Sequence, residues 1–376
     1  MKKALVVLSI LGLAFLFSSC SQESAAPALT GTWRLQSSAI NLEFMGVGSL
    51  TYLSFDDARP VAHAYGREPN IALKGCTHTL VDVRRELLVF WPDDTVGYLS
   101  SLAQAQPEPQ GLGFAFQYEV DGNTLTLADS EGRTAVFNKV AEVPAPERCE
   151  LLEATSSRPL SLPVNRAIGS NLLSDGSQLW VVGEDGKAYP IDPATGSVGA
   201  GQTLTGSFRH AVTMQGGDFW AHCRCGHNEE IRRVSLGGAV ADTINTDADL
   251  GNKINIRAGS WDGSRLWLWG RNYDSDRREL LLVNSDAEPD VLEDVLVFDT
   301  WTLRQFTHHD GKLWGLFHFA GWQLAELDPA AGRVTKSYVL PALEMGGDYL
   351  GIASLDGKLY LLARLDQDYA IYTFQP

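Results

Sequence analysis

Thiol and imidazole side chains gather in one short stretch, which reads HCRCGH over residues 222–227. If the stretch continues a strand, Cys223, Cys225 and His227 share one face and His222 points the other way. Thiolate and imidazole ligands suit zinc or copper. The spacing is not that of a zinc module, however, so a disulfide or two buried thiols is the preferred interpretation. We therefore predict no metal and keep these three residues as the alternative ligands.

Motifs of other common chemistries are missing from the sequence. It contains no Gly-x-Ser-x-Gly elbow, no His-Glu-x-x-His, no phosphate-cradling Gly-x-x-x-x-Gly-Lys loop and no dinucleotide fingerprint. We therefore assign no catalytic residue and no cofactor.

Composition narrows the class of protein. A length of 376 residues suggests about two domains of ~150 residues each. Hydrophobic residues make up 44%, which is enough for a sizeable core. The formal net charge of −16 repels phosphate backbones and argues against a nucleic-acid partner. Abundant glycine, with 36 residues, and the lack of long amphipathic helical patterns predict an all-β protein.

The N-terminus has the layout of an export signal. Lys2 and Lys3 precede an apolar run over residues 4–17, which is too short for a comfortable membrane span of ~20 residues. The string Phe17-Ser18-Ser19-Cys20 resembles the lipobox of bacterial lipoproteins, although that family prefers leucine where Phe17 stands. The resemblance implies cleavage before Cys20 and acylation of Cys20, palmitate included. The alternative is an ordinary signal peptide that ends near a cysteine.

The same resemblance implies a location in the bacterial cell envelope. Ser21 stands where an aspartate would favour inner-membrane retention, so the outer membrane is expected. Residues 1–19 would be the signal peptide and residues 20–28 a tether. The acyl chains must supply the membrane anchoring, because an acidic body is not attracted to anionic lipid.

Lipidation of Cys20 would leave Cys76, Cys149, Cys223 and Cys225. An exported protein meets oxidising conditions, so disulfides are permitted. Four cysteines allow three connectivities. Cys223 and Cys225 flank a single residue, so a strained ring between them is possible but not required. The predicted bridge joins Cys76 to Cys149.

Residues 29–142 have the pattern of a small β-barrel. Gly31-Thr32-Trp33 opens the segment, an Asp-Gly-Asn turn at residues 121–123 joins two alternating stretches, and the last stretch ends in Phe-Asn-Lys-Val at residues 137–140. These features resemble the bacterial lipocalin-like domain. The resemblance implies an up-and-down barrel with an apolar interior, which its own side chains or a ligand could fill.

A proline-containing connector, taken as a linker over residues 143–157, precedes five copies of a motif in which Asp-Gly or Gly-Gly is followed by an aromatic residue. The aromatic positions are Trp180, Trp220, Trp267, Trp314 and Tyr360. Their spacings of 40, 47, 47 and 46 residues are typical of propeller blades. We predict a five-bladed β-propeller over residues 158–376, with residues 160–164 supplying the strand that the last copy lacks and closing the ring. The alternative is an open solenoid or sandwich. The pattern resembles periplasmic propellers of the quinoprotein-like and outer-membrane-assembly type in architecture.

Arginines recur near the start of the first strand of four blades. Because these strands line the central channel, their starts meet at one mouth, and arginine recognises carboxylates and phosphates well. The predicted anion-binding mouth consists of Arg166, Arg209, Arg257 and Arg304, with His210 and Tyr349 on its rim. The alternative is that each arginine pairs with a carboxylate of its own or a neighbouring blade.

These observations lead to one expectation about function. We expect a membrane-anchored, non-catalytic binding or scaffold protein of the cell envelope, which uses the propeller face or channel. Its partner would be an envelope protein or a small anionic ligand. The alternative is a periplasmic propeller enzyme with an anionic substrate at the channel mouth.

Overall fold

The computed structural model describes residues 29–376 except 41, 43–48, 57–60, 68–73, 85–86, 92–113, 164–166, 205–207, 224–229, 288–289, 298–302, 320, 332, 342, 344–346 and 366–367. The lipobox and Cys20 therefore lie outside the described residues. Within the described residues, no helix has the length and apolar character needed to cross a bilayer.

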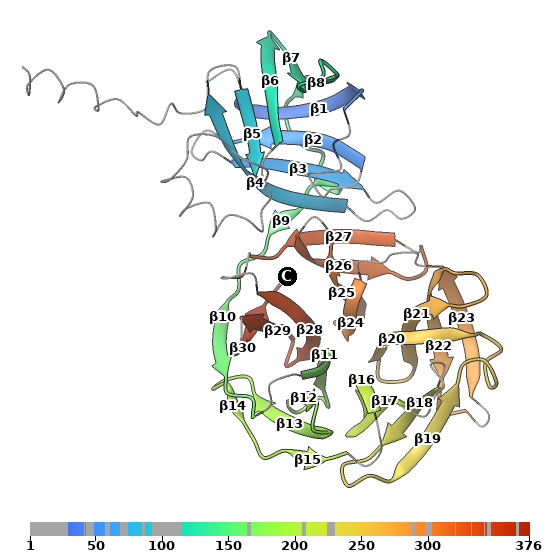
Figure 1. Cartoon of the computed structure of the whole chain (residues 1–376). Helices are drawn as coiled ribbons and strands as arrows, with labels where there is room; N and C mark the ends of the chain where they lie inside the picture. The colour runs from blue at the N-terminus through green and yellow to red at the C-terminus, as the bar shows by residue number, and fades with distance from the viewer. Residues whose placement is uncertain are drawn as a thin grey trace, which may run out of the picture.

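The N-terminal unit is a closed eight-stranded antiparallel barrel in which each strand pairs with its neighbour in sequence and the last pairs with the first (Figure 1). Its strands are β1 (Gly31–Ser38), β2 (Ser49–Phe55), β3 (Val61–Arg67), β4 (Lys74–Arg84), β5 (Leu87–Trp91), β6 (Phe114–Asp121), β7 (Thr124–Ala128) and β8 (Thr134–Val140).

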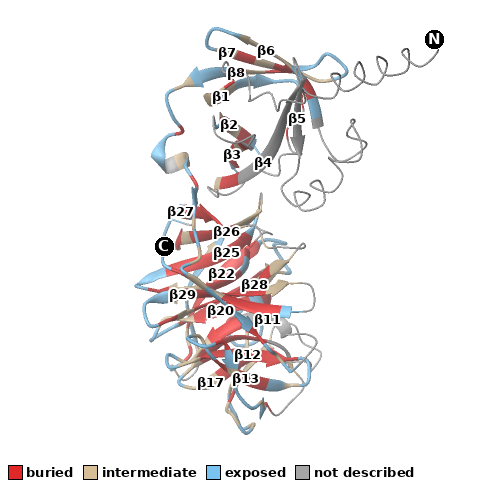
Figure 2. Ribbon diagram, turned by 90° about the vertical axis from the view of Figure 1, so that its left-hand side faces the viewer, coloured by how far each residue is buried: buried red, intermediate tan, exposed pale blue. Residues whose placement is uncertain are grey.

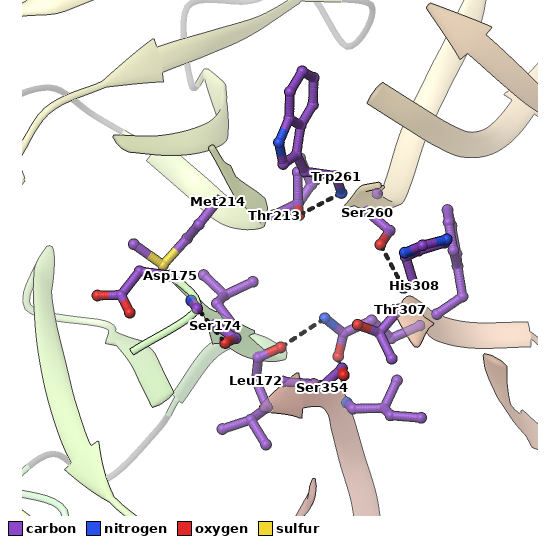
Figure 3. Close-up of a pocket in the computed structure, with 18 of the residues that line it drawn as sticks. Leu172, Ser174, Asp175, Thr213, Met214, Ser260, Trp261, Thr307, His308 and Ser354 are labelled. Carbon is purple, nitrogen blue, oxygen red and sulfur yellow. Dashed lines mark hydrogen bonds between the residues drawn. The ribbon is translucent and has the colours of Figure 1, made fainter. Parts of the chain in front are cut away.

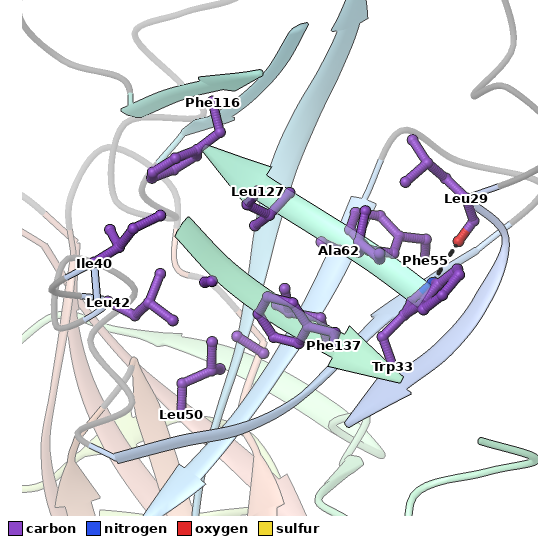
Figure 4. Close-up of a cluster of buried hydrophobic side chains, with 14 residues drawn as sticks. Leu29, Trp33, Ile40, Leu42, Leu50, Phe55, Ala62, Phe116, Leu127 and Phe137 are labelled. Carbon is purple, nitrogen blue, oxygen red and sulfur yellow. Dashed lines mark hydrogen bonds between the residues drawn. The ribbon is translucent and has the colours of Figure 1, made fainter. Parts of the chain in front are cut away.

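Aromatic and aliphatic side chains of the barrel's own strands pack together in its interior (Figure 4). Trp33 is fully buried, and its indole N–H donates to the carbonyl of Leu29 over 2.8 Å. This bond satisfies the one polar group that the indole carries inside. Phe55 and Phe137 lie in the same cluster. The described part of the interior is thus filled by the chain itself.

The C-terminal unit is a five-bladed β-propeller, as the five aromatic repeats predicted. Blade 1 holds β11 (Ala167–Ser174), β12 (Leu179–Gly183), β13 (Lys187–Asp192), β14 (Ser197–Val198) and β15 (Gln202–Thr203); blade 2 holds β16 (Phe208–Gln215), β17 (Asp218–Cys223), β18 (Glu230–Val234) and β19 (Val240–Asn245); blade 3 holds β20 (Ile254–Trp261), β21 (Leu266–Asn272), β22 (Arg278–Asn284) and β23 (Val291–Val297); blade 4 holds β24 (Leu303–His309), β25 (Lys312–His318), β26 (Trp322–Asp328) and β27 (Arg333–Val339); blade 5 holds β28 (Asp348–Leu355), β29 (Lys358–Leu365) and β30 (Asp368–Phe374).

Each pair of neighbouring blades shares one cluster of buried apolar side chains. The repeat aromatics belong to these clusters; Trp180 of blade 1, for example, meets Phe219 of blade 2 edge to face, with ring centroids 5.7 Å apart. Figure 2 shows the buried residues concentrated in the middle of the blades. The ring is therefore held by five apolar interfaces in which a large side chain from every blade takes part.

The strand that completes blade 5 is β10 (Ser156–Leu160), which pairs antiparallel with β30 from Ser156 opposite Thr373 to Leu160 opposite Tyr369. The prediction from sequence put this strand at residues 160–164, so the observed strand lies a few residues earlier. Leu160 is buried in the apolar cluster between blades 5 and 1, so the closing strand also contributes to an interblade interface.

The predicted Asp-Gly turns come in two lengths. Blades 2, 4 and 5 have two-residue turns, and Asp310 and Asp356 adopt left-handed backbone angles with φ of 50°. Such turns match the twist of the two strands that they connect. Blades 1 and 3 instead have four-residue loops, at residues 175–178 and 262–265. The Asp-Gly motif therefore belongs to a longer loop in these two blades.

The segment expected as a linker is structured and joins the two units. It contains the short 3-10 helix Ala145–Glu147 and strand β9 (Glu150–Leu151), which pairs in parallel with β27 of blade 4. The predicted disulfide between Cys76 of β4 and Cys149 is confirmed, with Cα atoms 5.8 Å apart. It packs against Val339 of β27, and a side chain at Gly75 would collide with the ring of Phe319. The barrel therefore rests on blade 4.

Candidate functional site

A cup of about 220 Å³ lies on the propeller axis, at the end where the inner strands run into the Asp-Gly turns (Figure 3). All five inner strands, β11, β16, β20, β24 and β28, contribute to its wall. They contact one another in a ring around the axis. Drug-sized ligands occupy sites of ~300–1,000 Å³, so this cup suits a smaller molecule.

Gln305 is part of the cup wall and reaches across the channel. Its side-chain amide donates to the carbonyl of Leu172 in blade 1 over 3.0 Å, and its amide oxygen accepts from the N–H of Ile352 in blade 5 over 2.7 Å. Only 1% of Gln305 is exposed. One side chain of blade 4 therefore bridges blades 5 and 1, and it ties three inner strands together at this level.

Every blade brings one hydroxyl to the cup. These hydroxyls belong to Ser174, Thr213, Ser260, Thr307 and Ser354. Two of them accept a hydrogen bond from the backbone of the next blade: Thr213 from the N–H of Trp261 over 3.2 Å, and Ser260 from the N–H of His308 over 2.8 Å. Ser174 accepts from the N–H of Gly176 within its own turn over 3.1 Å.

Ser354 has an imidazole partner outside the cup. Its hydroxyl lies 2.8 Å from Nδ1 of His309, whose Nε2 faces the carboxylate of Asp310 at 3.6 Å. Burial lowers the pKa of His309 below its ordinary value, against the opposing effect of Asp310, so the ring is neutral at pH 7. His308, the next residue toward the strand start, is half-buried and forms part of the cup's rim.

Asp175 supplies the one carboxylate among the described residues that line the cup. Its two oxygens accept from the indole N–H of Trp180 over 2.8 Å and from Ser177 and the N–H of Gln178. Burial by itself would raise the pKa of Asp175, but these hydrogen bonds outweigh it and hold that pKa below its ordinary value. Asp175 is therefore anionic at neutral pH and is saturated by its own loop.

The same loop recurs in blade 3. There Asp262 accepts from the indole of Trp267 over 3.0 Å, and in blade 2 Gln215 accepts from the indole of Trp220 over 2.9 Å. The repeat motif is thus a local hydrogen-bonded unit that orients the interblade tryptophan. Asp175 and Asp262 therefore serve the fold in these turns.

The arginines singled out from the sequence lie at the opposite end of the inner strands, away from the cup. Arg257 and Arg304 each occupy a β-bulge on adjacent strands β20 and β24, and Arg209 occupies a bulge on β16. Arg257 and Arg304 are exposed. Among the described residues neither makes an ion pair. Arg166 lies outside the described residues, and the side chains of Arg209 and His210 are likewise not described.

Tyr349 does not lie on a rim, in contrast to the expectation. It is 1% exposed, belongs to the apolar cluster between blades 4 and 5, and donates its hydroxyl to the carbonyl of Pro341 over 3.2 Å. Burial raises its pKa well above the ordinary value. In blade 5 the bulge residue is Leu350, so Tyr349 lies one position before the place that Arg257 and Arg304 hold in their strands.

The thiol-imidazole stretch is only partly described. His222 is buried on β17, at the position opposite His210 of β16. Cys225 and His227 lie outside the described residues, as does the side chain of Cys223. Groups of three or more metal-binding side chains are absent from the part of the chain that the structure describes.

The sequence analysis missed the five hydroxyls and Gln305. Serine and threonine are common in strands, and no single copy of the repeat marks them. Aligning the copies on their aromatic residue would have shown a hydroxyl six residues before it in blades 1 and 5 and seven residues before it in blades 2, 3 and 4. This recurrence is the signal that the sequence offers.

Together these features define the chain as an all-β protein whose C-terminal unit is a five-bladed β-propeller with an axial cup. No protein-family model and no curated protein sequence matches it. Among solved structures it is similar to the WD40 β-propeller domain of Doa1, with 10% identity, a TM-score of 0.35, and coverage of 92% of this chain and 96% of that one. It is also similar to BamB from Moraxella catarrhalis, with 10% identity, a TM-score of 0.28, and coverage of 70% of this chain and 79% of that one.

Proposed function

We propose that this protein is a lipid-anchored binding protein of the bacterial cell envelope, in which a lipocalin-like barrel positions a non-catalytic propeller. The leader and its lipobox support the anchor. The buried disulfide between Cys76 and Cys149 supports an oxidising compartment. The closed eight-stranded barrel, with Trp33 buried at its first strand, supports the lipocalin-like assignment.

One observation carries the choice of ligand for the propeller's arginine mouth, defined as Arg257 and Arg304. Several propeller arginines outside this mouth lie against carboxylates: Arg232 with Glu230, Arg233 with Asp218, Arg265 with Glu293, Arg271 with Asp276 and Arg364 with Asp348. Arg257 and Arg304 have no such partner among the described residues, although the chain carries a large acidic excess.

Exposed cations on neighbouring inner strands reinforce one another's field at the mouth of a channel. Guanidinium groups also bind carboxylate and phosphate oxygens through two parallel hydrogen bonds. We therefore assign to this mouth a small carboxylate or phosphate ligand, or an acidic side chain of a protein partner.

The test is a calorimetric titration of the mature protein with inorganic phosphate and with succinate, at low and at raised salt. The wild type should bind at least one of them, with an affinity that falls as salt is added. Arg257→Ala combined with Arg304→Ala should abolish this binding. Arg271→Ala is the matched control, because it removes an exposed arginine that already pairs with Asp276. Equal binding by the double variant would contradict the assignment.

The anchor is tested separately. Cys20→Ala should leave the protein as an uncleaved precursor or release it from the membrane fraction. A processed variant that still sediments with membranes would show that the leader does not act through lipidation.

A further inference from the structure

The axial cup is a second site, chemically distinct from the arginine mouth and independent of the function proposed for it. We propose that the cup binds a small, neutral, oxygen-rich solute of polyol or monosaccharide size. The argument rests on which protons the cup offers, on its charge and on its size.

The hydroxyls of the cup are arranged as hydrogen-bond donors. Thr213 and Ser260 already accept from backbone N–H groups of the neighbouring blade, and Ser174 accepts from Gly176. A hydroxyl carries one donor proton beside its acceptor lone pairs, so each of the three retains its proton for another partner. The side-chain hydroxyl of Thr307 has no hydrogen-bond partner among the described residues. Four consecutive blades, from 1 to 4, therefore offer O–H donors.

The fifth hydroxyl differs in the direction of its bond. The neutral ring of His309 turns Nε2 toward Asp310, and this favours a proton on Nε2 and leaves Nδ1 as an acceptor. Ser354 then donates to His309 and offers its lone pairs to the cup. The cup thus presents several donors and one acceptor, which fits a molecule that carries several hydroxyl or ether oxygens.

Charge separates this ligand class from the anions. Among the described residues that line the cup, none is lysine or arginine, whereas Asp175 carries a negative charge held by its lowered pKa. The hydrogen bonds that Asp175 accepts from its own loop keep it ionised, and like charges repel. A phosphate or carboxylate would therefore be repelled at the rim, while a neutral polyol would not.

Size and shape set the upper limit. The cup has a volume of about 220 Å³. The side chain of Gln305, which forms part of the wall, reaches across the channel to Leu172. Met214 and Trp261 add apolar surface at the rim, which suits the C–H faces of a sugar ring. At the ligand efficiency typical of drug-sized molecules, a twelve-atom sugar would bind with a Kd of about 2 mM.

The experiment titrates the mature protein with glycerol, D-glucose, D-galactose and N-acetyl-D-glucosamine, and in parallel with phosphate and acetate. We expect saturable binding of at least one neutral probe, unchanged by added salt. Thr307→Val replaces a hydroxyl without a protein partner by a methyl group of the same shape, so it should leave the melting temperature unaltered and weaken binding roughly fivefold. Thr243→Val, on the exposed outer strand β19, is the matched control and should bind as the wild type does.

A second variant protects the test against a folding defect. Ser174→Phe places a ring at the half-buried edge of the cup and should abolish binding of the neutral probe. The variant Arg257→Ala with Arg304→Ala should bind the neutral probe normally, which separates this site from the arginine mouth. The proposal is overturned if no neutral probe binds at ~10 mM, if only the anions bind, or if Thr307→Val and Ser174→Phe both bind like the wild type.

Discussion

Removal of the disulfide tests how the barrel is held on the propeller. Cys76 and Cys149 are separated by 73 residues, and the chain between them runs through β5 to β8 and the connector. Most of the barrel's second half therefore lies inside the closed loop. Loop-closure entropy for a ring of that length corresponds to about 4 kcal/mol of stabilisation at 25 °C.

The variant replaces both cysteines with alanine, because both side chains are buried and a serine hydroxyl there would add a cost of its own. We expect the barrel to lose roughly 3–4 kcal/mol of unfolding free energy. The propeller should be much less affected, because its five interblade clusters do not include either cysteine.

The assay monitors guanidinium unfolding by hydrogen exchange in peptides from each unit. The wild type under reducing conditions is the matched comparison. Barrel peptides should lose protection at lower denaturant in both the variant and the reduced protein, and the connector should become open to proteolysis. Unchanged protection of the barrel would refute the reasoning, because the loop constraint would then contribute nothing. Equal losses in both units would show that the bridge supports the propeller directly.

Three further predictions concern the ring. Leu160→Ala should lower the free energy of unfolding by about 2–5 kcal/mol, because Leu160 is buried between blades 5 and 1. The control Leu151→Ala, at a residue that is 47% exposed, should lower it little. Similar losses in both variants would argue against ring closure by this strand. Asp262→Ala should cost about 1–3 kcal/mol by leaving an indole N–H without its acceptor. Burial alone would raise the pKa of Asp262 and of Asp175, but hydrogen bonds lower both pKa values. The stability that these two carboxylates contribute should therefore be full above about pH 4 and lost as pH falls further. Asp262→Ala should flatten that acid dependence in a pH series of melting curves. Gln305→Ala should cost roughly 2–4 kcal/mol, since two buried backbone groups of other blades lose their partner, and an unchanged melting temperature would show that water replaces the amide.

Blade number and the disulfide could be predicted because both depend on local or countable features. Trp180 and its counterparts repeat at fixed spacing after a turn, and each copy is one hairpin that can be recognised within a few residues. Cys76 and Cys149 were predicted because the other pair is too close in sequence to bridge without strain. The closing strand was predicted by elimination, and its position was wrong by a few residues because a short outer strand carries little sequence pattern.

The binding sites could not be predicted as well, because they depend on register. Arg257 and Arg304 were correctly grouped at one end of the inner strands, since that grouping follows from their distance to the turns. Tyr349 was misplaced because the predicted register was off by one residue: the bulge of that strand is at Leu350, and a one-residue shift reverses the side that a residue faces. Such bulges occur in the inner strands of all five blades and leave no mark in the sequence.

The sequence by itself determined the all-β class, the five repeats and the acidic balance, because composition and short-range spacing carry that information. Only the tertiary structure placed the cup, because it forms where the turn-side ends of five separate inner strands converge. It also decided that Gln305 joins three blades, since its partners Leu172 and Ile352 lie 133 and 47 residues away along the chain. Contacts over such separations depend on closure of the ring, and no local pattern in the sequence specifies them.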